Sequence, residues 1–433
     1  MLILQTCWES HQICIGDEST RKNMLLCIPD FYTDHKDLVD MKKPIFLLFS
    51  ALLMTTSSFA QLSTLTVPGS SSPQIVSPIK FTLPGHSGTQ HFSAVDPNGK
   101  KWPVTIRDGH GVLVAPSTTN ETTYTIKKAE KYNLRIKKDK KSNRLDVFLG
   151  KELFTSFHYQ DERVKPYLWP LNADGEVGVS RDWPIGERNK TKDHPHHESF
   201  YTAYGDINDT DFWAFSSNKG FQKTTAGDRI TGAAYSTIYS ELTWHKEDGT
   251  PVVDEQRTYT FYNTPSEYRI FDLKTTLIAA HGDAKFDDTK EGGMATVRMN
   301  DDLREVGGSG TITNSEGGVG AGETWGKPAA WCDYSGSLDG VGNLGITIMD
   351  HPTSFRYPTH WHVRDYGLMG ANAFGYSYFY EKTDSTKNGD LLLKKGESIT
   401  FNYRIYIHKG DVNEANVAAQ YANFSKPLVA SAR

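Results

Sequence analysis

The 433-residue sequence has few cysteines, and it has no long apolar run after its first 60 residues. Three of the four cysteines lie within residues 1–40, and Cys332 is the only one that follows them. Because a single cysteine cannot form an intrachain disulfide, residues 61–433 must depend on a hydrophobic core for stability. No run of 18 apolar residues follows Ala60 either, so we expect no membrane-spanning helix there.

The sequence also lacks a strong excess of charge of either sign. It has 47 Lys and Arg residues against 52 Asp and Glu residues, a formal net charge of −5. Proteins that bind nucleic acid or anionic membranes usually carry a concentrated positive patch. The basic run from Lys127 to Lys141 comes nearest to one, and we interpret it as the solvated face of a hairpin because the whole chain is acidic. We therefore expect no nucleic-acid partner.

Residues 41–60 have the pattern of a secretory signal peptide. A short basic start is followed by an apolar run and then by the small-x-small sequence Ser-Phe-Ala, which ends at Ala60. The apolar run is too short to anchor the chain in a bilayer. We predict that residues 1–40 are an upstream extension from a mis-assigned start codon, and that the exported protein, periplasmic or secreted, begins at Gln61. A genuine N-terminal extension is the alternative.

Patterns typical of helices are scarce, whereas short β-branched and aromatic runs between turn residues are frequent. Examples of predicted strands are 122–126, 145–149, 257–262 and 399–407. Val412 to Phe424 is the one stretch with a clear apolar helical face. We predict an all-β protein, in which a small N-terminal β unit at 61–140 precedes a large antiparallel β-sandwich at 145–410 and a C-terminal helix and tail at 411–433.

The closing stretch from Leu391 to His408 has the pattern of a strand, a turn and a second strand. It resembles the L-x-x-G-E-x-x-x-x-x-Y-R ending of galactose-mutarotase-like β-supersandwich domains. The segment Tyr268 to Asp272 resembles an interior strand of the same class. This resemblance implies that the large domain is a galactose-mutarotase-like supersandwich.

Four further blocks occur in order along the large domain: 165–184, 193–213, 287–293 and 357–367. Together they resemble a family of exported bacterial proteins of unknown function that often carry the label "methane oxygenase". Particulate methane oxygenases are membrane-embedded copper proteins, and no membrane span is expected here, so the label has little weight. The family resemblance implies a setting in bacterial polysaccharide degradation and no proven reaction.

The second block holds three histidines within residues 194–197. In an extended chain, residues i and i+2 share a face, so His194 and His196 would project together, as would His360 and His362. Two such pairs on neighbouring strands would converge. They could bind Zn, Cu, Ni or Fe, perform metal-free acid–base chemistry with a carboxylate, or cap strand ends through backbone hydrogen bonds. We favour acid–base chemistry because no further ligand spacing occurs, and the sequence identifies no cofactor.

In this hypothesis His196 and His362 are the general acid or base, and Glu198 or Glu291 is the carboxylate partner. Aromatic faces would stack on the apolar face of a sugar, while charged groups would hold its hydroxyls or a uronate carboxylate. The predicted substrate-binding residues are Arg181, Asp182, Trp183, Lys290, His360, Arg364 and Tyr366. A charged turn at 290–293 and an ordinary aromatic core are the structural alternatives.

The leading functional prediction is an exported carbohydrate-active enzyme that acts on oligosaccharide or polysaccharide fragments. Mutarotation, β-elimination from a uronate and glycoside hydrolysis all fit the residues. One alternative is a non-catalytic glycan-binding module, for which the aromatic residues would suffice. The other is a metal-dependent enzyme that uses the histidine clusters.

Overall fold

The computed structural model divides the chain into two units, Met1–Phe59 and Ala60–Arg433. In the first unit, strands β1 (Ile3–Cys7) and β2 (Gln12–Gly16) pair in antiparallel fashion. The predicted signal peptide lies outside the described residues. The structure describes residues 3–7, 12–16, 62–71, 75–129, 133–139, 141–159, 164–187, 189–214, 218–380, 384 and 386–433.

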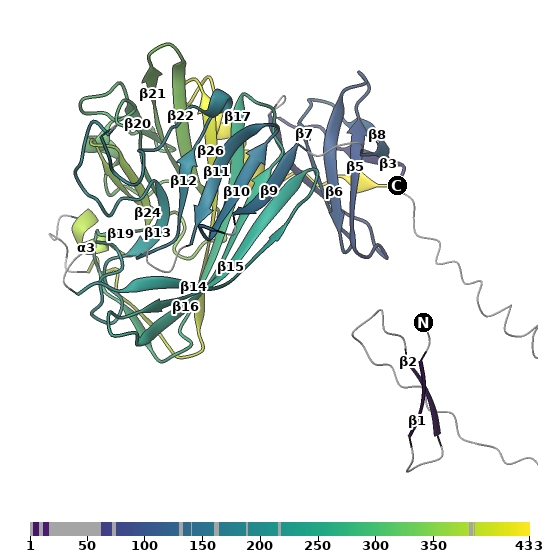
Figure 1. Ribbon diagram of the computed structural model, residues 1–433. Coiled ribbons are helices and arrows are strands. Elements are labelled where there is room, and N and C mark those ends of the chain that lie inside the picture. The colour runs from purple at the N-terminus through teal and green to yellow at the C-terminus, as the bar shows by residue number, and fades with distance from the viewer. Residues whose placement is uncertain are drawn as a thin grey trace, which may run out of the picture. The chain divides into compact units, whose positions relative to one another are not determined.

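Two eight-stranded antiparallel sheets form the large domain (Figure 1). The first sheet has the order β23 (His360–Arg364), β24 (Leu368–Asn372), β19 (Gly292–Arg298), β13 (Phe200–Tyr204), β12 (Tyr167–Leu171), β11 (Glu152–His158), β10 (Arg144–Leu149) and β9 (Leu134–Asp139). The second has the order β14 (Phe221–Ile230), β15 (Tyr235–His245), β16 (Pro251–Tyr262), β17 (Tyr268–Ile278), β26 (Ser398–Lys409), β22 (Gly342–Asp350), β21 (Trp331–Leu338) and β20 (Thr311–Asn314).

A seven-stranded antiparallel sheet forms the small N-terminal unit. Its order is β27 (Ser431–Ala432), β3 (Thr64–Val67), β8 (Thr122–Lys128), β5 (Thr89–Val95), β6 (Lys101–Arg107), β7 (His110–Pro116) and β4 (Val76–Thr82). The remaining elements are β18 (Ala284–Phe286), β25 (Leu391–Leu393), the 3-10 turn η1 (Asp174–Glu176), and the helices α2 (Ala321–Thr324), α3 (Tyr376–Phe379) and α4 (Val417–Ser425). The predicted all-β class, a large sandwich with a small β unit, is confirmed.

Aromatic side chains from the two large sheets meet in one core. Phe154 of the first sheet contacts Phe261 and Phe271 of the second, with ring centroids 5.6 and 6.0 Å apart. Phe200 contacts Phe271 at 5.3 Å. Each of these side chains is buried, and full burial of one such side chain contributes about 1.5–3 kcal/mol. The apolar face of each sheet therefore holds the sandwich together.

Strand alternation decides which residues of the first sheet point away from this core. On β23, Trp361 and Val363 belong to the core between the sheets, so His360, His362 and Arg364 project from the opposite face. That outer face is itself covered. Tyr201 and other aromatic residues form a second cluster there, and the cluster includes Trp213 from a following loop. The candidate site is built on this outer face.

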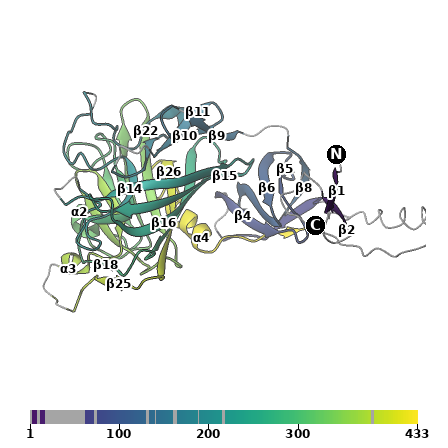
Figure 2. The ribbon, with the colours of Figure 1, turned by 60° about the horizontal axis from the view of Figure 1, so that its bottom comes forward.

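The seven-stranded sheet and the sandwich are joined by side-chain and backbone contacts. The amide of Ala234 donates to Thr105 Oγ1 on β6 at 2.9 Å. Gln420 Nε2 on α4 donates to the carbonyl of Val76 at 3.2 Å, and Figure 2 shows α4 next to β4. Buried apolar residues of both parts belong to one cluster.

Two local predictions need correction. The C-terminal helix begins at Val417 rather than Val412, because Asp411 Oδ1 accepts from the amides of Asn413 and Glu414 in a turn and Asn416 is left-handed, with a φ of 51°. The basic run at 127–141 is not one hairpin, since β8 and β9 belong to different sheets.

The closing stretch forms the predicted strand, turn and second strand, but the two strands do not pair with each other, because β25 pairs with β18 while β26 pairs with β17 and β22. Strand β17 lies inside the second sheet, as expected. Cys332 lies buried on β21. No helix within the described residues is long and apolar enough to cross a membrane.

Candidate functional site

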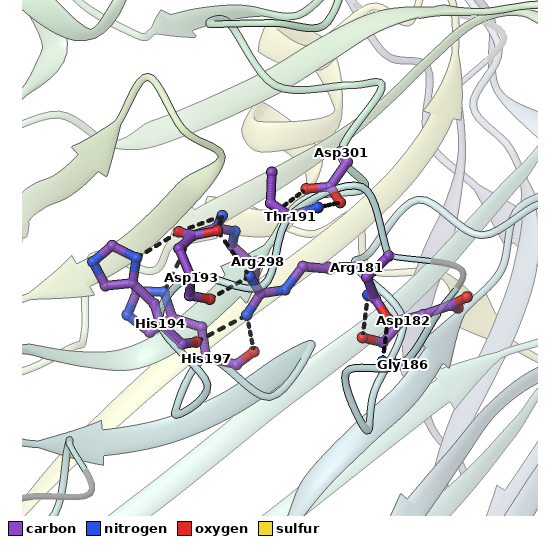
Figure 3. A network of polar contacts seen from close by, with 10 residues as sticks. Arg181, Asp182, Gly186, Thr191, Asp193, His194, His197, Arg298 and Asp301 are labelled. Carbon is purple, nitrogen blue, oxygen red and sulfur yellow. Dashed lines mark hydrogen bonds and ion pairs between the residues drawn. The ribbon is translucent and has the colours of Figure 1, made fainter.

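Residues 193–199, here called the histidine loop, lead into β13 without forming a strand of their own. The buried side chain of Arg181 holds the loop from behind (Figure 3). Its Nη1 donates to the carbonyl of Asp193 at 2.8 Å, and its Nη2 donates to the carbonyls of His194 and His197 at 2.9 and 3.2 Å. Burial and the neighbouring Arg298 lower the pKa of Arg181 to about 10, so it stays charged at neutral pH.

Asp193 connects the loop to β19. Arg298 Nη2 donates to both carboxylate oxygens of Asp193, at 3.0 and 2.9 Å, and Nδ1 of His194 lies 2.5 Å from Asp193 Oδ2. Burial acts to raise the pKa of Asp193, but the hydrogen bond with His194 and the Arg298 guanidinium outweigh it and hold this pKa far below its usual value. The carboxylate therefore remains ionised and keeps the His194 ring oriented.

A second carboxylate fixes the chain that precedes the loop. Thr191 donates its amide and its hydroxyl to Asp301, at 2.9 and 2.5 Å. Asn189 closes a turn by accepting from the amide of Gly186 at 2.7 Å and donating to the carbonyl of Asp182 at 3.0 Å. Figure 3 shows these contacts on either side of Arg181. The chain that enters the histidine loop is therefore fixed on its N-terminal side.

A cavity of about 440 Å³ opens beside the histidine loop. Its residues come from the loop, from the segment after β13, from the start of β19, and from β23 with its following turn. They are His194, His196, His197, Trp213, Ala214, Lys290, Glu291, His362, Arg364 and Tyr366.

Two imidazoles of the loop stack on each other, and the third meets both of them edge-on. The ring of His194 is nearly parallel to the rings of His197 and Tyr366, with centroids 4.9 and 4.7 Å away. The ring of His196 meets His197 edge-on at 4.4 Å. Trp213 lies between the loop and β23, with centroids 5.5 Å from His197 and 5.8 Å from His362. These contacts limit the rotation of each ring.

Burial keeps three of these histidines neutral at pH 7. Burial first, and the charge of Lys165 next, lower the pKa of His196 to about 3. Burial and the adjacent His196 hold the pKa of His197 well below its ordinary value. Burial, followed by Arg364 and Lys290, does the same for the pKa of His362. Each neutral imidazole then offers one N–H donor and one acceptor nitrogen.

Charged side chains form the remaining wall of the cavity. Lys290 and Glu291 form an ion pair with each other, and Asn372 Nδ2 fixes their backbone by donating to the carbonyl of Lys290 at 3.1 Å. Arg364 extends from β23, and its guanidinium lies 5.1 Å from the ring centroid of Trp325. The wall therefore carries two cations and one carboxylate.

A family model described as a family of unknown function, DUF6807, matches residues 144–422. The chain belongs to this family. The expected membership of a family of unknown function is confirmed, and the DUF6807 region contains every residue that lines the cavity.

No curated protein matches the chain. Among solved structures, galactose 1-epimerase from Lactobacillus acidophilus NCFM is similar to this DUF6807 protein at 8% sequence identity, with a TM-score of 0.28. The match covers 65% of this chain and 100% of that one.

The structure of the DUF6807 domain brings most of the predicted site residues to the cavity, but His360 is separate. His360 lies against Phe379 at 5.6 Å, and its Nε2 lies 3.3 Å from the hydroxyl of Tyr380. The expected convergence of four histidines is therefore not formed. In the part of the chain that the structure describes, no three His, Cys, Asp or Glu side chains are placed to share a metal ion.

His194 and His196 were expected to project from one face of an extended strand, but the chain is not extended there. His194 has a φ of 45°, a left-handed conformation that a strand does not contain. The loop consequently turns, and His197 rather than His196 stacks on His194.

Four other predicted residues lie outside the cavity lining. Glu198 is buried 3.7 Å from the ammonium of Lys165, which also donates to the carbonyl of Trp213 at 3.1 Å. Arg181 holds the loop backbone, as described above. Trp183 packs edge-on against Tyr167 at 6.5 Å, and the carbonyl of Asp182 accepts from Asn189. These groups support the site from behind and do not line it.

Glycines at the start of β19 accommodate protein side chains rather than a ligand. A Cβ atom at Gly292 would lie 2.4 Å from the ring of Tyr204, and one at Gly293 would lie 2.0 Å from Thr296 Oγ1. At both positions the absence of a Cβ atom makes room for protein side chains. They let β19 pack closely next to Lys290 and Glu291.

The sequence prediction missed His197 and Trp213. His197 does not fit the i, i+2 pattern that selected His194 and His196. Trp213 lies in the same sequence block as the histidines, and this proximity was the available signal.

Proposed function

We propose that this DUF6807 protein is an exported carbohydrate-active enzyme that transfers a proton on a sugar within the described cavity. The observation that carries the proposal is the group of three neutral imidazoles, His196, His197 and His362, which pack around Trp213 and line the same cavity as the carboxylate of Glu291. The signal-like pattern at 41–60 supports export, and N-terminal sequencing of the exported protein should find Gln61 first.

The size and the lining of the cavity suit a sugar ring. Its volume of about 440 Å³ lies within the range of about 300–1,000 Å³ that is usual for small-molecule sites. The half-buried Tyr366 supplies aromatic surface for the C–H face of a sugar, while Trp213 is buried in the cavity wall. Among the described residues, no group accepts a hydrogen bond from Trp213 Nε1, so a sugar hydroxyl could accept one.

The lining residues favour proton transfer over hydrolysis by two carboxylates. Glycosidases that act in that way place two carboxyl groups on either side of the glycosidic bond, and Glu291 is the one carboxylate among the described cavity-lining residues. A neutral imidazole whose conjugate acid has a pKa of about 3 accepts a proton poorly at pH 7, but its N–H can stabilise negative charge that develops on an oxygen. Glu291 is then the group placed to accept the proton, and His196 and His362 are the donors.

Turnover and binding should be measured on one panel of reducing sugars, uronates and oligosaccharides. Anomer exchange followed by NMR, unsaturated products followed by absorbance, and release of new reducing ends distinguish mutarotation, elimination and hydrolysis. Binding without any of these reactions would reject the enzyme and indicate a glycan-binding module.

His196→Ala and His362→Asn test the proposed donors. Loss of one hydrogen-bond donor to a developing oxyanion typically lowers the rate by about 10²–10³, which corresponds to about 2.7–4 kcal/mol. The exposed His281, paired with Asp254 on β16, gives the control variant His281→Ala, which should keep the full rate. Melting curves should show that all three variants are folded. Full turnover in both cavity variants would place the chemistry elsewhere.

A further inference from the structure

The charged residues of the cavity wall are not balanced. Two cations, Lys290 and Arg364, and one carboxylate, Glu291, line it. Lys290 and Glu291 are paired with each other. Within the described part of the chain, no carboxylate lies within ion-pair distance of the Arg364 guanidinium. The cavity therefore presents one cation whose charge is not paired with a carboxylate.

The cations behind the cavity differ from Arg364 in this respect. Lys165 lies 3.7 Å from Glu198, and both Arg298 and Arg181 contact Asp193, at 2.9 and 3.5 Å. Each of these three cations is thus paired with a carboxylate of the protein. Arg364 is the cation that remains available to a ligand.

The position of Arg364 is fixed by its strand and by its aromatic neighbours. It lies two residues after His362 on β23, so both side chains project from the same face. The ring of Trp325 lies 5.1 Å from its guanidinium, a cation–π contact that orients the group, and Tyr366 accepts one hydrogen bond from it. A guanidinium held in this way presents two parallel N–H groups that match a carboxylate.

Besides burial, the same excess of positive charge lowers the pKa values of two cavity histidines. The non-histidine charges that lower the pKa of His196 and His362 are the cations Lys165, Arg181, Arg298, Arg364 and Lys290. An anion that enters the cavity would therefore meet favourable charge from several directions, and it would not have to displace a protein carboxylate from Arg364.

We propose that the cavity binds a uronic acid, with the sugar carboxylate paired to Arg364 and the ring beside Trp213 and His362. This inference rests on the proposed sugar site and names its substrate class. A carboxylate fits better than a phosphate ester because one unpaired guanidinium matches a single negative charge.

The test measures binding of D-galacturonate and D-glucuronate to the full-length protein by calorimetry at pH 7. The comparison ligands are galactose, glucose and the methyl ester of galacturonate, which keeps the shape and removes the charge. We expect both uronates to bind at least about 10-fold more tightly than the neutral sugars, because a hydrogen-bonded charge pair is worth that much or more. Equal affinity for the acid and its methyl ester would overturn the proposal.

Arg364→Gln removes the charge and keeps a polar side chain. Arg364→Lys keeps the charge and removes the planar guanidinium with its two parallel N–H groups. In Arg364→Gln the uronate affinity should fall by about 10- to 100-fold, while the affinity for galactose should change by less than about twofold. Arg364→Lys should recover part of the loss. The control is Arg107→Gln, an exposed position on β6. If Arg364→Gln weakens every sugar equally, the residue supports the cavity and does not select a carboxylate.

The outcomes separate this inference from the proposed function. Uronate preference without turnover would keep the ligand class and reject the enzyme. Turnover of neutral sugars without uronate preference would keep the enzyme and reject the ligand class. Tighter binding of a sulfated sugar than of either uronate would also reject it.

Discussion

Replacement of Arg181 by methionine should loosen the histidine loop and destabilise the whole domain. The guanidinium is buried and donates to the carbonyls of Asp193, His194 and His197. Methionine fills much of the same volume but leaves these carbonyls without their donor. Each buried acceptor that loses a charged donor costs about 1–3 kcal/mol, and breaking a buried ionic contact costs about 3–5 kcal/mol in total. We expect a loss of about 3–5 kcal/mol.

Thermal unfolding followed by circular dichroism measures this loss. At about 2 °C per kcal/mol for a large domain, the Tm of Arg181→Met should fall by about 6–10 °C. Arg144→Met is the matched control, since Arg144 is partly exposed in its pair with Asp146 and such pairs contribute less than about 1 kcal/mol. Sugar binding should weaken in Arg181→Met and persist in the control. A Tm within about 1 °C of the wild type would refute the reasoning that Arg181 holds the loop.

Two further predictions concern buried groups outside the cavity. Burial raises the pKa of Asp350 to about 7, above its value of about 3.9 in an unfolded chain. The folded state therefore binds more protons between these values, so its stability falls as pH rises from about 4 to 7, by up to about 4 kcal/mol at about 1.36 kcal/mol per pH unit. Asp350→Asn should remove this dependence and raise the Tm at pH 8, and a lower Tm at that pH would contradict the argument. Cys332 is buried on β21, and burial raises the pKa of its thiol. Melting should therefore be the same with and without dithiothreitol, whereas a drop of several degrees would reveal a disulfide.

Local patterns predicted the elements better than they predicted the pairing. The strand at 399–407 could be read from its residues, since β-branched and aromatic side chains alternate there, and it forms β26. Its partner could not be read in the same way. β25 lies close to β26 in sequence but pairs with β18, about 100 residues earlier. Which edges meet depends on the whole sheet, and nearby residues carry little information about it.

At the candidate site, too, local patterns predicted single segments better than they predicted the contacts between segments. The unusual density of histidines at 194–197 pointed to the loop that lines the cavity, and Glu291 and Arg364, which also line it, were identified from their sequence blocks. His360 was grouped with His362 because strand spacing places them on one face, but the aromatic residues at 376–380 surround His360 separately. Glu198 was a reasonable partner until the buried Lys165 was placed beside it. Both errors arise from contacts between segments that are distant in sequence.

The C-terminal strand β27 completes the edge of the small sheet next to β3. The backbone of Arg433 bonds to Ser63 and Thr64, with N–O distances of 2.7, 2.9 and 3.0 Å, so β3 has β27 as its outer partner. Pairing between residues so far apart in sequence is slow to form, because a long chain must first be ordered. Until it forms, β3 is an open sheet edge that can pair with another molecule. Removal of residues 427–433 should therefore promote self-association through this edge, while the cavity of the large domain stays intact.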